Sequence, residues 1–296
     1  MSQDTRWAES DRLHEQGMAL DDAGDSDGAL RKYFAALELE IARSNTLYNI
    51  GLIYKYRGAW KDSFRFNKRA HELAPDDQAA AWNLAIAATA LRDWVNARSV
   101  WNSLGLPIDL GDGAINEDFG LTPIRLKPID DGEVVWARRI DPVRARLCNI
   151  PLTDSGCRYG DVVLHDGAAV GYRMNGDREC PVFNMLEVFE ESGFSTFEAD
   201  VVAPTEADVI ALESICDRVG VAFEDWSKSI QVLCKDCSEG RPHDHHVDEG
   251  ATSLWSPERR IALAAESATD VQAVLDEWLN ADRSVTGWQE TLSAAR

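Results

Sequence analysis

The segment LYNIGLIYKYRGAWKDSFRFNKRAHELAP, residues 47–75, has the pattern of two helices that are joined by a turn at Gly58 and closed by Pro75. Matching positions recur through the first hundred residues at a spacing of 34 residues. Small residues occupy many of them: Gly17, Gly51 and Ala85; Gly24 and Gly58; Ala29, Ser63 and Ala97; Ala36 and Ala70. Because small side chains allow two helix backbones to approach closely, the pattern predicts antiparallel helical hairpins that pack against one another.

On this pattern residues 10–104 resemble the tetratricopeptide repeat family, with three units that start near Ser10, Ser44 and Gln78. The quoted segment is the unit that matches best. The first unit has Ile41 where the second has its closing proline, and the third runs into GLPIDLGDG, residues 105–113. Irregular end units are expected of a short solenoid, because terminal units face water or another domain.

The resemblance implies a concave surface that is lined by the first helix of each unit and binds peptides or protein partners. Its positions include His14, Met18 and Asn45, and we predict that the partner is bound by Tyr48, Asn49, Leu52, Lys55, Tyr56, Trp82, Asn83 and Ile86. Rings offer a large contact area and amides pair with a backbone, so this set suits an extended or helical segment. The alternative is that Tyr48, Tyr56 and Trp82 pack against the next domain.

The segment LGLPIDLGDGAINEDFG, residues 104–120, mixes Gly, Pro and Asp without helical periodicity. We therefore expect helical repeats over residues 1–108, a linker over 109–122 and a second domain over 123–296.

The second domain has short segments rich in β-branched and aromatic residues, which predict strands. These are IRLKPI (124–129), EVVWARRI (133–140), GDVVLHDG (160–167), FSTFEADVVA (194–203), VAFEDW (221–226), SIQVLC (229–234) and RRIALAAE (259–266). VFNMLEVFEESG (182–193) fits a helix or a strand and is interpreted as a strand, while DDG (130–132) and HDG (165–167), followed by AAVGYRMNGD, have the composition of hairpin turns. Helices are predicted after the N-cap Thr205, ending before Gly220, and from Thr269 to about Asn280. The expected class is an α+β domain with a mostly antiparallel sheet.

Within this domain VVWARRI, CNIPL, YGDVV and ESGFST make residues 123–225 similar to an uncharacterised bacterial domain family, some members of which neutralise toxins. This second resemblance implies a binding or inhibitory role and carries no catalytic residue onto the chain.

Potential metal ligands concentrate in CKDCSEGRPHDHH, residues 234–246. Thiolates and imidazoles suit tetrahedral zinc, and the candidate ligands are Cys234, Cys237, His243, His245 and His246. Tetrahedral zinc has four coordination positions, and this segment offers five candidate ligands. The segment therefore favours a structural site in which protein side chains fill all four positions over a catalytic site that keeps one position for water. A solvated histidine-rich loop and a thioredoxin-like cysteine pair remain as alternatives.

The chain is acidic, with a formal net charge of −21, which argues against nucleic acid or an anionic membrane as a partner. Ten acidic residues and no Lys or Arg occur between Glu179 and Asp217, which predicts either a solvated surface or a docking surface for a basic protein. The N-terminal residues lack the apolar run of a signal peptide, and no stretch of 18 apolar residues occurs, so we expect a cytoplasmic protein.

These observations favour a zinc-stabilised protein-binding module, with an immunity or inhibitor protein as a special case, rather than an enzyme. A metal-dependent hydrolase whose repeats recruit a protein substrate and a scaffold subunit of a larger assembly remain open.

Overall fold

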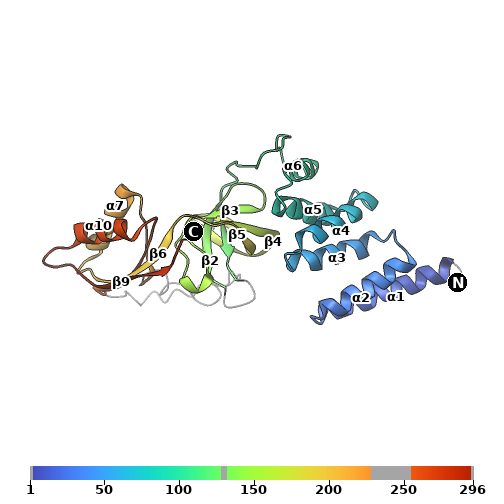
Figure 1. Ribbon diagram of the computed structural model, residues 1–296, viewed down its shortest axis with the longest axis horizontal. Coiled ribbons are helices and arrows are strands. Elements are labelled where there is room, and N and C mark those ends of the chain that lie inside the picture. Colours follow the sequence, from blue (N-terminus) through green and yellow to red (C-terminus); the bar gives the residue numbers. More distant parts are fainter. Residues whose placement is uncertain (1–2, 128–131, 228–254, 295–296) are drawn as a thin grey trace. The chain divides into compact units, whose positions relative to one another are not determined.

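The computed structural model describes residues 3–127, 132–227 and 255–294 (Figure 1). The chain divides into two compact units, Met1–Asn116 and Glu117–Arg296. The division falls inside the segment that the sequence predicts to be a linker.

The first unit consists of helical hairpins, as the repeat predicts. Its helices are α1 (Gln3–Asp22), α2 (Ser26–Leu39), α3 (Ser44–Tyr56), α4 (Trp60–Leu73), α5 (Gln78–Ala90) and α6 (Trp94–Ser103). The second helices of the hairpins begin at Ser26, Trp60 and Trp94, so the period of the sequence is also the period of the structure. The first helix begins at Gln3, earlier than the expected Ser10.

Close contacts at two glycines explain why the repeat needs small residues. A Cβ atom on Gly17 would lie 2.5 Å from the ring of Tyr33, and one on Gly51 would lie 2.5 Å from the side-chain nitrogen of Asn67. Between the helices the core is filled by larger side chains, among them Tyr33, Leu47, Ile50, Ile53 and Phe66. The predicted close approach of the hairpin helices is therefore confirmed.

The turn inside each hairpin keeps one backbone conformation. Gly24 has a φ of 83°, Gly58 a φ of 65°, and the matching residue of the third unit, Arg92, a φ of 58°. Glycine adopts this left-handed region without the steric penalty that a Cβ atom brings. The third unit thus keeps the turn although it has lost the glycine.

The second unit begins with a closed barrel of five strands: β1 (Leu121–Arg125), β2 (Val134–Arg139), β3 (Arg144–Leu147), β4 (Val162–Asn175) and β5 (Arg178–Glu190). Successive strands are antiparallel, and because their number is odd the closing pair, β1 and β5, is parallel. The strand interpretation of residues 182–193 is confirmed for most of its length. The turn predicted at residues 165–167 is wrong, because β4 continues through them with register shifts. The chain reverses after Asn175, within the segment AAVGYRMNGD that is also predicted to turn.

A buried ion pair fixes the turn between β2 and β3. Asp141 Oδ1 accepts hydrogen bonds from the backbone nitrogens of Val143 at 2.7 Å and Arg144 at 2.5 Å, and its Oδ2 lies 2.5 Å from Arg144 Nε. Both side chains are almost completely buried. The aspartate therefore holds the turn and compensates the arginine charge.

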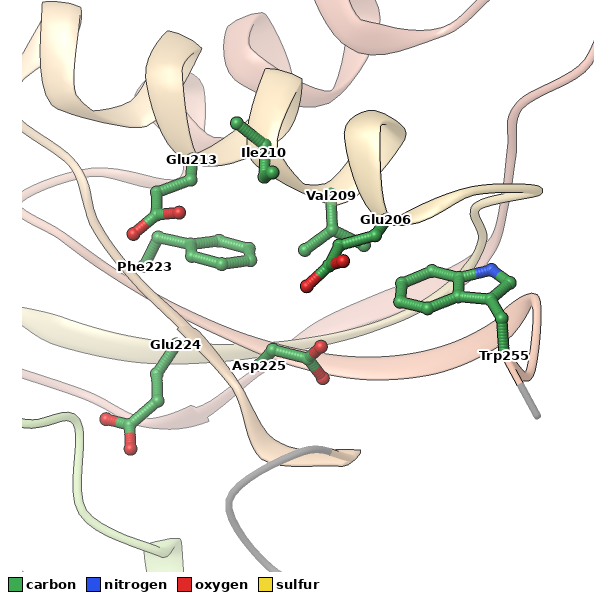
Figure 2. A pocket seen from close by; sticks show the side chains of 8 residues that line it. All are labelled: Glu206, Val209, Ile210, Glu213, Phe223, Glu224, Asp225 and Trp255. Atoms are coloured by element: carbon green, nitrogen blue, oxygen red, sulfur yellow. The ribbon is translucent and has the colours of Figure 1, made fainter. Parts of the chain in front are cut away.

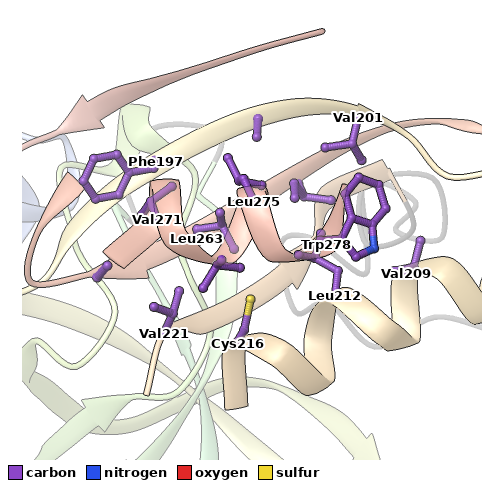
Figure 3. Close-up of a cluster of buried hydrophobic side chains, with 14 of the residues drawn as sticks. Phe197, Val201, Val209, Leu212, Cys216, Val221, Leu263, Val271, Leu275 and Trp278 are labelled. Carbon is purple, nitrogen blue, oxygen red and sulfur yellow. The ribbon is translucent and has the colours of Figure 1, made fainter. Parts of the chain in front are cut away.

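The remaining strands form an antiparallel sheet of order β7-β8-β6-β9, with β6 (Ser195–Val202), β7 (Ala222–Asp225), β8 (Glu258–Ala265) and β9 (Ser284–Leu292). Two helices, α7 (Glu206–Val219) and α10 (Ala268–Trp278), pack on one face of it. Figure 3 shows Leu212 and Cys216 of α7 and Leu275 and Trp278 of α10 in this core, together with Leu263 of β8. The expected α+β class with mostly antiparallel pairing is confirmed.

Helix α7 has the ends that its sequence predicts. Thr205 and Asp208 form a reciprocal capping box at its start. Gly220 ends it with a φ of 77°, in the left-handed region.

Two glutamates join the barrel to the sheet by binding one segment between β3 and β4. The backbone nitrogen of Leu152 donates to Glu133 Oε2 at 3.0 Å, and that of Ile150 donates to Glu224 Oε2 at 2.8 Å. Trp226 Nε1 donates to the Ile150 carbonyl at 3.2 Å. Burial, together with the charge of Glu224, raises the pKa of Glu133 to about 7 in spite of the hydrogen bond from Leu152. Burial also raises the pKa of Glu224.

Candidate partner-binding sites

The predicted groove residues lie on α3 and α5, the first helices of the second and third hairpins. Tyr48, Asn49 and Leu52 are half-buried on α3, and Tyr56 at its end is 62% exposed. On α5, Trp82 is half-buried, with its ring centre 4.8 Å from that of Trp101 on α6. Lys55, Asn83 and Ile86 are buried. The predicted groove residues therefore divide into side chains that are buried and side chains that remain partly exposed to solvent.

The buried members connect the two helices directly. Lys55 Nζ donates to Asn83 Oδ1 at 3.2 Å, and the same ammonium lies 4.4 Å from the ring centre of Tyr56. A buried charge needs such partners, because burial without them is costly. Lys55 and Asn83 thus fix the spacing of α3 and α5, a role that the sequence does not reveal.

A polar network joins α1 to α3 in the same way. His14 Nδ1 is 2.9 Å from Thr46 Oγ1, and its Nε2 is 3.3 Å from Asn45 Nδ2. Arg43 donates from Nε to Thr46 Oγ1 at 3.2 Å and pairs with Asp11 at 2.5 Å. Burial lowers the pKa of His14. His14 and Asn45, which the repeat places on the concave surface, are hydrogen-bonded to each other, whereas Met18 is 45% exposed.

A pocket of about 320 Å³ lies in the second unit between α7 and the edge strand β7. Its apolar lining comes from Val209 and Ile210 of α7, Phe223 of β7 and Trp255, which precedes β8. Figure 2 shows the rings of Phe223 and Trp255 at opposite ends of the pocket. Trp255 is held in place because its Nε1 donates to the Ala203 carbonyl at 2.9 Å.

Four carboxylates complete the lining. Glu206 and Glu213 extend from α7 toward β7, and Glu224 and Asp225 come from β7 itself (Figure 2). Asp225 pairs with Arg259, whose guanidinium carbon lies 4.9 Å from the ring centre of Trp255. In the part of the chain that the structure describes, no lysine or arginine lines this pocket. The sequence gives no sign of the site, because its walls come from segments that only the sheet brings together.

The predicted zinc ligands Cys234, Cys237, His243, His245 and His246 lie outside the described residues. Among residues 3–127, 132–227 and 255–294, no three His, Cys, Asp or Glu side chains gather as a metal site requires. The other cysteines, Cys148, Cys157, Cys180 and Cys216, are free thiols, and only Cys148 is exposed. None of the described helices is long and apolar enough to cross a bilayer.

No protein-family model matches this chain, and no curated protein matches it. Among solved structures it is similar to the tetratricopeptide domain of Arabidopsis OM64, with 16% identity and a TM-score of 0.32 over 34% of this chain and 85% of that one. It is also similar to the N-terminal domain of stress-induced protein-1 from C. elegans, with 19% identity and a TM-score of 0.31 over 35% of this chain and 88% of that one. A hypothetical protein from Neisseria gonorrhoeae covers more of the chain, 62%, and 99% of its own length, with 10% identity and a TM-score of 0.28.

Helices α1 to α6 show the tetratricopeptide arrangement in their own hairpins and period. None of the comparisons shows the resemblance of residues 123–225 to a toxin-neutralising family.

Proposed function

We propose that this chain is a protein-binding module whose helical unit holds a peptide segment of its partner against α3 and α5. The observation that carries the proposal is the division of the groove residues. Lys55 and Asn83 are buried and hydrogen-bonded to each other, and Ile86 is buried, whereas Tyr48, Tyr56 and Trp82 keep part of their aromatic surface exposed. Aromatic side chains beside residues that are held in place by packing and a hydrogen bond bind a peptide with little loss of side-chain entropy.

The test is partner capture by the full chain and by Tyr48→Ala and Trp82→Ala, with quantitative mass spectrometry of the bound proteins. Phe64→Ala on α4 is the matched control, because it removes a half-buried ring from the second helix of the same hairpin. We expect a partner that the wild-type chain and the control capture and that both groove variants lose, at unchanged helical content. Equal recovery by all four proteins contradicts the proposal.

We also propose that the partner is basic, with a secreted toxin neutralised by this chain as the special case. The support is the net charge of −21 and the acidic stretch from Glu179 to Asp217. Association should then slow steeply as ionic strength rises, because salt screens the attraction that steers encounter. An association rate that does not respond to salt contradicts this part of the proposal.

The proposed zinc is structural, held by Cys234, Cys237 and two of the three histidines of residues 243–246. The support is the type and spacing of these residues. We expect one zinc per purified chain by elemental mass spectrometry and its loss when Cys234 and Cys237 are both changed to Ser. Cys148→Ser, which removes an exposed thiol elsewhere, is the control. Equal zinc content in the three proteins contradicts the assignment.

A further inference from the structure

The pocket between α7 and β7 combines two kinds of surface that a cationic side chain needs. Val209, Phe223 and Trp255 offer apolar and aromatic contact, and Glu206 and Glu213 place carboxylates toward it from α7. At about 320 Å³ it is at the lower end of the volume range of ligand sites, about 300–1,000 Å³, so it suits one or two side chains rather than a large cofactor.

The wall of the pocket already stabilises one guanidinium. Arg259 donates from Nε to Asp225 Oδ2 at 3.1 Å and places its guanidinium carbon 4.9 Å from the Trp255 ring centre. Arginine suits such a combination, since its planar group stacks on rings and donates to carboxylates in a fixed geometry. Asp225 and Trp255, which both line the pocket, therefore already bind the guanidinium of Arg259 together.

The remaining carboxylates differ in what they are able to bind. Glu224 accepts hydrogen bonds from Ile150 and Asn149, so part of its capacity is used inside the chain. Glu213 is exposed, lies one helical turn beyond Val209 and Ile210, and extends over Phe223. It is the carboxylate best placed to meet a cation that enters from solvent.

We propose that the α7/β7 pocket binds an arginine side chain of a protein partner, with the guanidinium between Glu206 and Glu213 and the aliphatic part against Val209 and Phe223. Charge complementarity selects this occupant: besides Asp225, which pairs with Arg259, and Glu224, which accepts hydrogen bonds from Asn149 and Ile150, the described lining holds Glu206 and Glu213 and no lysine or arginine. The inference rests on the proposed basic partner and deepens it, because Glu206 and Glu213 belong to the acidic stretch from Glu179 to Asp217. It is independent of the groove, since the pocket involves neither α3 nor α5.

The probe is the capped tripeptide acetyl-Leu-Arg-Leu-amide, titrated into the full chain with ¹⁵N-labelled tryptophan and followed by NMR. The indole signal of Trp255, assigned by its absence in Trp255→Phe, should shift on binding. Replacing arginine by citrulline, which keeps the shape and removes the charge, should weaken binding at least about ten-fold.

The double variant Glu206→Gln and Glu213→Gln should lower the affinity for the arginine peptide about ten-fold, because each exposed pairing contributes modestly. Asp217→Asn is the matched control: it removes one charge from an exposed residue of the same helix that does not line the pocket, and should change affinity less than about two-fold. Any one of three results overturns the proposal: the Trp255 signal does not shift at about 10 mM peptide, the citrulline peptide binds as tightly as the arginine peptide, or the double variant and the control have equal affinity for the arginine peptide. None of these results bears on the groove, whose test uses different residues.

Discussion

Glu133→Gln is the substitution whose effect follows most directly from the structure. The carboxyl lies at the junction of barrel and sheet, accepts a hydrogen bond from Leu152 and has its pKa raised by burial from 4.5 to about 7. A group whose pKa is higher in the folded chain than in the unfolded chain contributes full stability below pH 4.5 and loses it as pH rises to about 7. Glutamine keeps an acceptor for Leu152 and carries no charge at any pH.

The magnitude follows from the two pKa values. A rise from 4.5 to about 7 corresponds to about 3.4 kcal/mol in the free energy of unfolding, of which about 2.5 kcal/mol falls between pH 5 and pH 8. The stability of Glu133→Gln relative to wild type should therefore increase by up to about 2.5 kcal/mol between these two pH values.

The assay is urea unfolding followed by tryptophan fluorescence at both pH values, with separate transitions fitted for the two units. Glu258→Gln, at an exposed position at the start of β8, controls for the general effect of removing one negative charge. If wild type and Glu133→Gln differ by the same free energy at the two pH values, Glu133 is not titrating as its burial requires, and the reasoning fails.

Three further substitutions test the packing. Gly58→Ala should lower the free energy of unfolding, measured by urea titration, by about 1–2 kcal/mol, because it places a Cβ atom on a residue with a φ of 65°. Gly113→Ala is the control: a Cβ atom at either glycine would have no other atom within 4 Å, but Gly113 has no positive φ, so its free energy of unfolding should not change. Gly51→Ala should lower the free energy of unfolding by about 1–3 kcal/mol, because the added Cβ atom clashes with Asn67. In a double-mutant cycle with Asn67→Ala the two losses in free energy should not be additive, and strict additivity would contradict the close contact. Asp141→Ala should destabilise the second unit by about 3–5 kcal/mol, since it leaves a buried arginine uncompensated, and a thermal midpoint within a degree or so of wild type would argue against that.

The helical unit was predictable because its information is local. The contact of Gly51 with Asn67 recurs in kind one period earlier, at Gly17 and Tyr33, so a single spacing in the sequence specifies the hairpins. Helix α7 was predictable for the same reason, since Thr205 and Gly220 mark its ends within the segment itself.

The barrel and the pocket were not predictable in this way. Barrel closure depends on the pairing of Ile124 with Phe183, and nothing in either strand specifies the other. Residues 165–167 have the composition of a turn, yet the chain does not reverse there: His165 pairs with Met185 of β5, the register then shifts, and pairing resumes at Ala169 with Phe183. The groove prediction named Lys55 as a binding residue, but whether that side chain faces a neighbouring helix or a ligand is decided by packing.

Barrel closure also sets an order in which the chain acquires its structure. Each hairpin of the first unit joins neighbours in sequence, whereas β1 must wait for β5, and chains with local contacts form native structure sooner. The helices should therefore assemble while the barrel strands still expose unpaired edges, which are the surfaces on which incomplete chains aggregate. Mutual repulsion between chains of net charge −21 opposes such aggregation during this interval, so the acidic composition protects the molecule before any partner is met.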